Sequence, residues 1–270
     1  PQINSVVTAP SIESGICINT ALQLNATVSN LANSTNTISW EQNGVTIPGQ
    51  SELQLNFAAI SKANHGDLIL KVANACGTAS KTMNIKVIDL PQFTQSPVAV
   101  TTCVNGNANF TAKVQPTTDG TPFGFQWLRN GTAYTGTGII SDEKLALSNV
   151  LAADAGYYAL QASNACGIVT SATGKLTVIA AGPTITQQPT AINTCAGAEN
   201  TVSIIATSED NTLTYSWYKN GIEIANETTA QLIFKTIATS DAGTYKAVVT
   251  NGCGLATTSN NFIVVVKEKV

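Results

Sequence analysis

Three copies of one sequence pattern divide this 270-residue chain, and they constrain its fold more than any other feature. Trp40, Trp127 and Trp217 stand 87 and 90 residues apart, and an Asn-Gly step follows each of them within four residues. Asn-Gly accommodates the positive φ angles of a two-residue turn, so each tryptophan is predicted to lie on a strand that leads into a hairpin. The spacing indicates a structural unit that is repeated three times.

Each repeat continues with short strands. Apolar and polar residues alternate in "ELQLNF", "KLALSNV" and "QLIFKTI", and turn residues separate these runs from their neighbours. A period of two is typical of a strand with one buried face, and no stretch carries a convincing helical period. The repeats therefore predict an all-β chain of packed sheets.

Further phrases give the repeats a family resemblance. "DAGYYAL" and "DAGTYKA" precede a turn written "NACG", "NACG" and "NGCG" in successive repeats. With the tryptophans, these phrases resemble the immunoglobulin-like superfamily over nearly the whole chain. They are most similar to the tandem immunoglobulin-like repeats of secreted bacterial surface proteins, of the adhesin or fibre type. The resemblance implies three immunoglobulin-like β-sandwich domains, at 1–89, 90–181 and 182–270, in an extended rod.

The links between these domains are predicted to be short. Pro91 and Pro183 each stand twelve residues before the first cysteine of their repeat, which sets the phase of the boundaries. About two to four residues then join one sandwich to the next, fewer than a flexible linker needs. We expect a stiff rod on the order of 100–130 Å long.

Composition excludes several classes of function. Charged residues make up 11% of the chain and the formal net charge is −3, so no basic patch is available for nucleic acid. No apolar run approaches the roughly 20 residues that span a bilayer, and no basic-then-apolar leader is present, so we expect a mature chain or a fragment without membrane insertion. Six cysteines in a β-rich chain favour an oxidising, extracellular or cell-surface setting.

The cysteines do not occupy the positions that the resemblance implies. In a typical immunoglobulin domain, the middles of strands B and F hold a disulfide between the two sheets. Here those positions pair a large with a small apolar residue, so hydrocarbon is predicted to close each core at constant volume. The predicted core consists of Trp40, Trp127, Trp217, Tyr158, Tyr245 and the pairs Ala26/Leu70, Ala112/Leu160 and Ile204/Ala247.

All six cysteines instead stand at fixed offsets from these core positions. Cys17, Cys103 and Cys195 lie nine residues before the B position, near the A–B corner, while Cys76, Cys166 and Cys253 lie six after the F position, in the F–G turn. The two groups belong to opposite ends of a sandwich, tens of ångströms apart, and a disulfide tolerates a Cα separation of only about 7 Å.

Two disulfide schemes remain open from the sequence. Base rates for secreted domains favour bonds within domains, Cys17–Cys76, Cys103–Cys166 and Cys195–Cys253, and require another placement of the A–B corner. Geometry favours a staggered scheme between domains, Cys17–Cys166 and Cys103–Cys253. That scheme leaves Cys76 and Cys195 at the ends, for flanking immunoglobulin-like domains or further copies of the chain.

Candidates for chemistry are few, and we expect no enzyme, metal site or cofactor. His65 is the only histidine, so no Ser/His/Asp set is plausible. The acidic pairs Asp142/Glu143 and Glu209/Asp210 lack the spaced oxygen ligands of a calcium site. Phe123, Phe125 and Tyr134 form the one local excess of aromatics, with core packing as the first interpretation and a ligand patch as the second.

These observations predict an extracellular structural or adhesive protein: a stiff stalk or fibre subunit of a bacterial surface, cross-linked by disulfides. The alternatives are a recognition module for glycans or a host protein, and an accessory region of a larger secreted enzyme.

Overall fold

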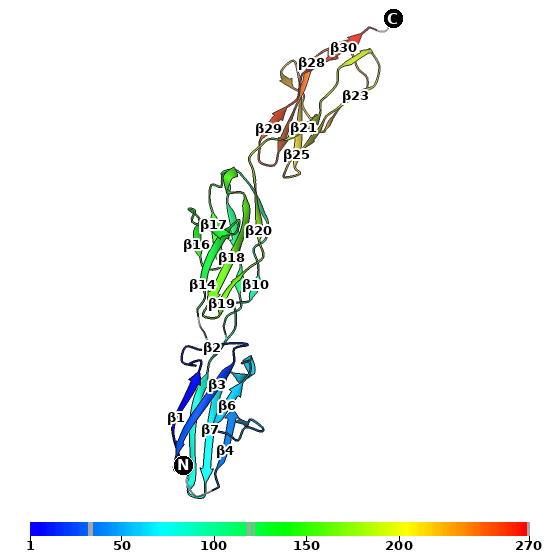
Figure 1. The fold of residues 1–270 in the computed structure, drawn as a ribbon. Coiled ribbons are helices and arrows are strands. Elements are labelled where there is room, and N and C mark those ends of the chain that lie inside the picture. Colours follow the sequence, from blue (N-terminus) through cyan, green and yellow to red (C-terminus); the bar gives the residue numbers. More distant parts are fainter. Residues whose placement is uncertain (32–34, 118–119, 121, 269–270) are drawn as a thin grey trace.

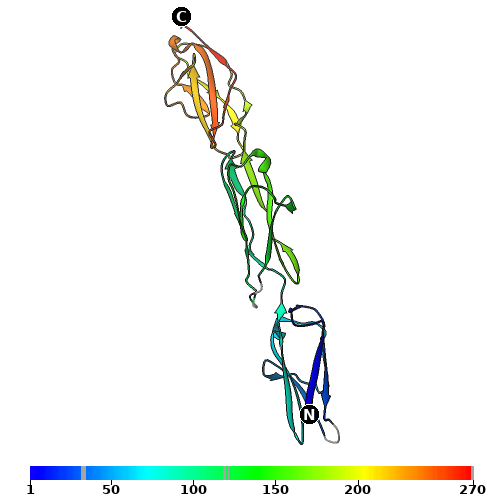
Figure 2. The same cartoon turned by 90° about the vertical axis from the view of Figure 1, so that its left-hand side faces the viewer.

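The computed structural model describes residues 1–31, 35–117, 120 and 122–268. It contains three β-sandwich modules that lie end to end in an extended array, with the two termini at opposite ends (Figure 1). The same arrangement is visible after a quarter turn (Figure 2). Strands and three short 3-10 turns make up the regular structure of the described residues. None of the helical segments in these ranges is long and apolar enough to cross a membrane.

Module 1 has two facing sheets, of order β1-β3-β6 and β5-β4-β7-β8, and a short parallel pair, β2-β9. Its elements are β1 Gln2–Ala9, β2 Ile16–Cys17, β3 Leu22–Ser29, β4 Thr37–Gln42, β5 Val45–Thr46, β6 Gln54–Phe57, η1 Lys62–Asn64, β7 Gly66–Asn74, β8 Gly77–Ile85 and β9 Val87–Ile88.

Module 2 repeats this plan, with the sheet β11-β20-β18-β14-β15, to which β19 adds beside β18, facing β12-β17-β16 and the pair β10-β13. Its elements are β10 Phe93–Gln95, β11 Val100–Cys103, β12 Ala108–Thr111, β13 Lys113–Val114, β14 Gly124–Arg129, β15 Thr132–Ala133, β16 Ile139–Ser141, β17 Lys144–Leu147, η2 Ala152–Asp154, β18 Gly156–Asn164, β19 Gly167–Thr170 and β20 Gly174–Ile179.

Module 3 follows the same plan, with β22-β30-β28-β25-β26 and β29 on one side and the pairs β23-β27 and β21-β24 on the other. Its elements are β21 Thr184–Gln187, β22 Ile192–Cys195, β23 Asn200–Ser203, β24 Ile205–Thr207, β25 Leu213–Lys219, β26 Ile222–Glu223, β27 Gln231–Phe234, η3 Thr239–Asp241, β28 Gly243–Asn251, β29 Ala256–Thr258 and β30 Phe262–Lys267.

The predicted hairpins and linkers are present. Asn130 and Gly131 adopt φ angles of 51° and 79° between β14 and β15, and the other two Asn-Gly steps do the same. Residues 89–92 and 180–183 separate the last strand of one module from the first strand of the next. These segments contain both boundaries expected from the repeat phase.

A separate hydrophobic core fills each module around its tryptophan, which is 0% exposed in all three. Each indole Nε1 donates to a backbone carbonyl, so the buried N–H is satisfied. The acceptors of Trp40, Trp127 and Trp217 are the carbonyls of Glu52, Asp142 and Thr229, in that order.

The predicted pairing of Ala26 with Leu70 at the centre of module 1 needs a correction. Leu70 is fully buried on β7, opposite Trp40 on β4, as expected for the F position. Ala26, its predicted small partner, lies only half-buried against the core, because Leu22 and Leu24 supply the buried positions of β3. The large Leu70 side chain is therefore covered by a leucine-rich strand as well as by the alanine. The other predicted core residues are all buried.

Candidate functional site: the junctions between modules

The corner cysteines sit at the C-terminal end of their modules. Cys17 ends β2, which runs parallel to β9 and places Cys17 opposite Ile88. The same register sets Cys103 opposite Ile179 and Cys195 opposite Lys267. In each case the residue after the cysteine donates its backbone N–H to that strand, at 3.0, 3.0 and 2.9 Å. One backbone arrangement therefore presents all three cysteine side chains.

The other three cysteines sit in the F–G turn at the opposite end of each module. An asparagine two residues earlier accepts a hydrogen bond from the cysteine backbone N–H through its side-chain Oδ1. The distances are 2.9 Å at Asn74, 2.9 Å at Asn164 and 3.1 Å at Asn251. This local bond fixes the cysteine at the tip of the hairpin.

Two disulfides join neighbouring modules. Cys17 is bonded to Cys166 with a Cα separation of 5.5 Å, and Cys103 to Cys253 with a separation of 5.6 Å. These are the bonds of the staggered scheme, and the structure does not contain the bonds within modules. The reason is geometric: the two cysteines of a module lie at its opposite ends, while the corner of one module meets the F–G turn of the next.

Polar contacts accompany each disulfide. At the first junction the Asn164 side-chain amide donates to the Asp89 carbonyl at 2.6 Å, and at the second the Asn251 amide donates to the Ala181 carbonyl at 3.0 Å. Each asparagine thus orders its own turn through Oδ1 and holds the incoming linker through Nδ2. The sequence analysis missed this role, although the asparagine stands two residues before the cysteine in all three repeats.

Contacts made by the linker residue Asp89 also hold the first linker in place. Asp89 forms a 2.6 Å ion pair with Lys62 and accepts from the backbone N–H of Leu90 at 2.9 Å. Leu90 lies over the next module, close enough that a Cβ added to Gly167 would stand 3.0 Å from its Cδ2. At the second junction, a Cβ on Gly182 would stand 2.8 Å from Thr257 Oγ1. Both junctions therefore combine a covalent bond with close packing of the linker.

Cys76 and Cys195 are exposed free thiols, at the F–G turn of module 1 and the corner of module 3. These are the two cysteines that the staggered scheme leaves for neighbouring units. No group of three or more His, Cys, Asp and Glu side chains among the described residues is arranged to hold a metal ion.

The aromatic residues considered as a ligand patch do not form an exposed platform. Phe125 and Tyr134 pack partly buried against the core of module 2. Phe125 contacts the ring of Phe123, whereas Tyr134 contacts Tyr158. Phe123 lines a hollow beside the first linker that Asp89 and Leu90 also border. Phe125 lies two residues before Trp127 and so shares its inward face, which explains the burial.

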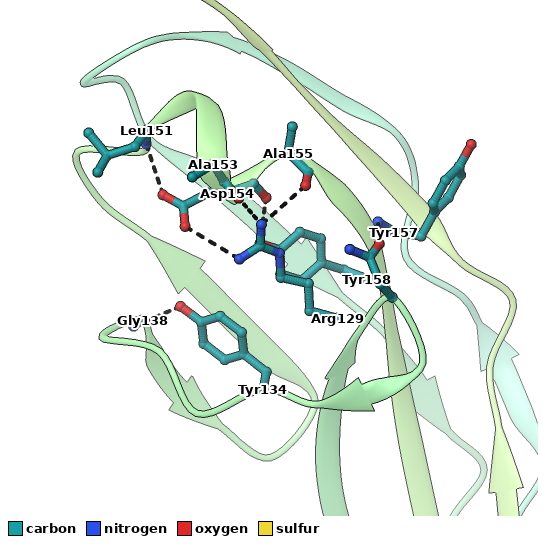
Figure 3. A network of polar contacts seen from close by, with 10 residues as sticks. Arg129, Tyr134, Gly138, Leu151, Ala153, Asp154, Ala155, Tyr157 and Tyr158 are labelled. Carbon is teal, nitrogen blue, oxygen red and sulfur yellow. Dashed lines mark hydrogen bonds and ion pairs between the residues drawn. The ribbon is translucent and has the colours of Figure 1, made fainter.

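Tyr134 instead borders an open hollow of about 580 Å³ that a network of polar contacts organises (Figure 3). The Arg129 guanidinium donates to the carbonyls of Ala153 and Ala155 and pairs with the Asp154 carboxylate at 3.7 Å. Tyr158 donates its hydroxyl to the Asp154 carbonyl at 2.8 Å. These hydrogen bonds all end on backbone carbonyls of the turn formed by η2, so the network holds the protein's own backbone.

Burial raises the pKa of Tyr158 to about 12, and it does the same for Tyr245. Tyr245 makes the equivalent bond to the Asp241 carbonyl at 2.7 Å. In module 1 Leu68 occupies this position, and the Nδ1 atom of His65 accepts the backbone N–H of Val87 at 3.2 Å. His65 is therefore a structural residue of the turn between β6 and β7.

The acidic pairs have structural partners as well. Glu143 accepts the backbone N–H of Val114 at 2.6 Å. Asp210 accepts hydrogen bonds from the Ser208 hydroxyl and from the backbone N–H groups of Thr212 and Gly252, which lower the pKa of its carboxyl. These carboxylates stabilise loops of modules 2 and 3.

Comparisons with known proteins agree with the architecture. A family model described as immunoglobulin domain matches residues 180–266. The fold resembles a three-domain titin I-band fragment, I67–I69, with a TM-score of 0.55 and 15% identity over 93% of this chain and 94% of that one. It also resembles the eight N-terminal domains of Down Syndrome Cell Adhesion Molecule, with a TM-score of 0.53 and 17% identity over 98% of this chain and 36% of that one.

By its fold, the chain is a tandem array of three immunoglobulin-like domains, and disulfides join neighbouring domains. A curated relative, a peroxidasin homolog of Caenorhabditis briggsae, is 28% identical over 158 residues, or 53% of this chain. The match covers 12% of that protein's length.

Proposed function

We propose that this chain is a non-catalytic, extracellular structural rod whose disulfide-clamped junctions hold immunoglobulin-like modules in line. The observation that carries the proposal is the presence of two covalent connections at each junction, one linker and one disulfide. A single linker lets one module bend and rotate relative to the next, whereas two attachment points on different edges of a module restrict both motions. Disulfides form and persist in oxidising compartments, which supports an extracellular or cell-surface location.

A bacterial surface stalk or fibre is the specific setting that the sequence phrases favour. The similar proteins identified by comparison are animal proteins: a titin fragment, a cell adhesion molecule and a nematode peroxidasin homolog. A rod of tandem modules is compatible with a bacterial surface and with animal proteins of this kind. The proposed function therefore depends on the disulfide-linked junctions, which are the same in either organism.

The rod is tested by its bending. Negative-stain electron microscopy of single oxidised molecules should give a narrow distribution of angles between modules. In the variant Cys17→Ser/Cys166→Ser, the distribution should broaden at the first junction and stay narrow at the second. Cys103→Ser/Cys253→Ser serves as the matched variant with the opposite pattern. Equal distributions in all three proteins, with circular dichroism showing folded modules, would refute the proposed stiffness.

A further inference from the structure

The two free thiols are the separated halves of a third junction. Cys195 ends β22 opposite Lys267, in the same parallel register that places Cys17 and Cys103 for bonding. Cys76 is fixed by Asn74 through the same 2.9 Å bond that fixes Cys166 at Asn164. At both internal junctions, residues in these two positions are bonded to each other.

The F–G end of module 1 is open at the position where the first linker covers the equivalent surface of module 2. Gly77 corresponds to Gly167, over which Leu90 lies, and no atom stands within 4 Å of a Cβ at Gly77. The Asn74 amide corresponds to the Asn164 amide that holds the linker, and in module 1 it contacts Asn36 Oδ1 at 3.4 Å instead. The β7–β8 hairpin lies at the end of the molecule opposite the C-terminus (Figure 1).

We propose that Cys195 of one chain and Cys76 of a second copy form a disulfide that joins the copies head to tail. Both halves of the junction are present on one molecule, at opposite ends, so a second copy is a sufficient partner. A contact between two different surfaces gives a ring where the rotation between copies closes and an open filament where it does not, and a rod with its two cysteines at opposite ends favours the filament. This inference rests on the proposed rod, because a flexible chain would let its own ends meet.

The bond forms by two exchange steps with a small disulfide such as oxidised glutathione. The Cys76 thiolate attacks one sulfur, forms a mixed disulfide and releases one glutathione thiol. The Cys195 thiolate of the second chain then attacks the protein sulfur of that mixed disulfide and releases the second glutathione. Two protein thiols lose two electrons and two protons, and one glutathione disulfide becomes two thiols.

Two variants separate directed pairing from random oxidation. Cys76→Ser keeps only the thiol of module 3, and Cys195→Ser keeps only that of module 1. An equimolar mixture of the two, with one carrying a mass tag, is oxidised with glutathione and resolved by non-reducing electrophoresis. Mixed dimers should exceed either symmetric dimer by roughly twentyfold, about ten times the excess that random pairing gives, which is equivalent to about 1.4 kcal/mol of preference for the docked pair.

The unmodified chain should form a ladder of multimers, and each variant alone should lose every species larger than a dimer. The Asn74→Asp variant keeps the acceptor for the Cys76 backbone N–H and removes the amide donor, so it should form mixed dimers several-fold more slowly. Random proportions of the three dimers, with mixed dimers about half of the total, would overturn the proposal. So would a failure of mixed dimers to form while peptide mapping shows both internal bonds intact.

The outcome is independent of the bending measurement, which uses monomers. If the monomers are rigid but do not pair head to tail, the proposal of a stiff rod is retained and the proposal of a filament is rejected. In that case a flanking module of a longer polypeptide would be the partner of each free thiol.

Discussion

At the scale of single residues, the centres of modules 2 and 3 keep a nearly constant volume without sulfur. Leu160 lies opposite Trp127 on β18, and Ala112 supplies the small partner from the other sheet. In module 3 the sizes are exchanged, with Ile204 large and Ala247 small. The compensation avoids both a void and an overpacked contact, each of which costs roughly 1–3 kcal/mol or more. The thiols are thereby available for use at the module ends.

The buried tyrosine hydroxyls make stability depend on pH. Because burial raises the pKa of Tyr158 and Tyr245 from 10.0 to about 12, the unfolded chain releases these protons first as pH rises. Stability from both groups is complete below pH 10 and is lost between pH 10 and about 12. Urea unfolding followed by circular dichroism should show this decline.

Replacing both hydroxyls should flatten the decline. Tyr158→Phe/Tyr245→Phe removes the two titrating groups, whereas Tyr157→Phe changes an exposed ring and should leave the profile as it is. Absorbance of tyrosinate at alkaline pH gives an independent measure of the same pKa values. A double variant with an unchanged decline would show that other groups cause it.

At the scale of elements, the 3-10 turns η1, η2 and η3 repeat one arrangement with different residues. Asp154 accepts the backbone N–H of Leu151 at 2.8 Å, Asp241 accepts that of Ala238 at 2.8 Å, and Asn64 accepts that of Ser61 at 2.9 Å. An amide oxygen thus replaces the carboxylate in module 1, and the turn is retained without the tyrosine.

This equivalence predicts how module 2 tolerates substitution. Asp154→Ala removes the acceptor and the ion pair with Arg129 and should cost about 1 kcal/mol of unfolding free energy. Asp154→Asn keeps the acceptor and should lose a smaller part. Hydrogen exchange of residues 151–156 reports the turn directly. Equal losses in both variants would mean that the hydrogen bond to Leu151 is not what stabilises it.

Local elements were predictable where a residue type has one structural meaning. The Asn-Gly steps and the tryptophans fixed the hairpins and the core, and constant offsets placed the cysteines at opposite ends of each module. Two contacts at the first junction were not predictable: the packing of Leu90 over Gly167 and the hydrogen bond from the Asn164 amide to the Asp89 carbonyl. Both depend on the path of the linker, which no periodic sequence pattern encodes. Core packing, the first interpretation of the aromatic cluster of module 2, is confirmed for Phe125 and Tyr134, and the strand phase from Trp127 places Phe125 inward.

The centre of module 1 shows where counting along the sequence falls short. The offset from Trp40 placed Leu70 correctly at the buried F position, because β4 and β7 pair directly in the same sheet. The same counting gave Ala26 as the partner of Leu70 across the core. How deeply a residue of β3 is buried, however, depends on how the facing sheet covers that strand. Burial across two sheets is a tertiary property, and a spacing rule within one repeat does not contain it.

At the scale of the whole molecule, the disulfides shorten the covalent route between the ends. The shortest route runs from Pro1 to Cys17, crosses to Cys166, returns to Cys103, crosses to Cys253 and continues to Val270. It contains about 100 residues, so at about 3.5 Å per residue the greatest extension is on the order of 350 Å, compared with over 900 Å for the reduced chain.

Pulling single molecules from both ends should reveal this limit. With optical tweezers, oxidised chains should stop lengthening near the shorter value even after every module has unfolded, and reductant should release the rest. The Cys17→Ser/Cys166→Ser variant should reach an intermediate length, because one of its two crossings is lost. Equal final lengths before and after reduction would contradict the route.

The two cross-links also overlap along the chain, since one spans residues 17–166 and the other 103–253. A protease that cuts the backbone once, anywhere between residues 17 and 253, leaves both fragments tied through at least one pair of sulfurs. Within residues 103–166 both pairs survive as bridges across the cut. A molecule exposed to extracellular proteases therefore stays in one piece after a first nick, and severing it takes either a second cut or a reductant.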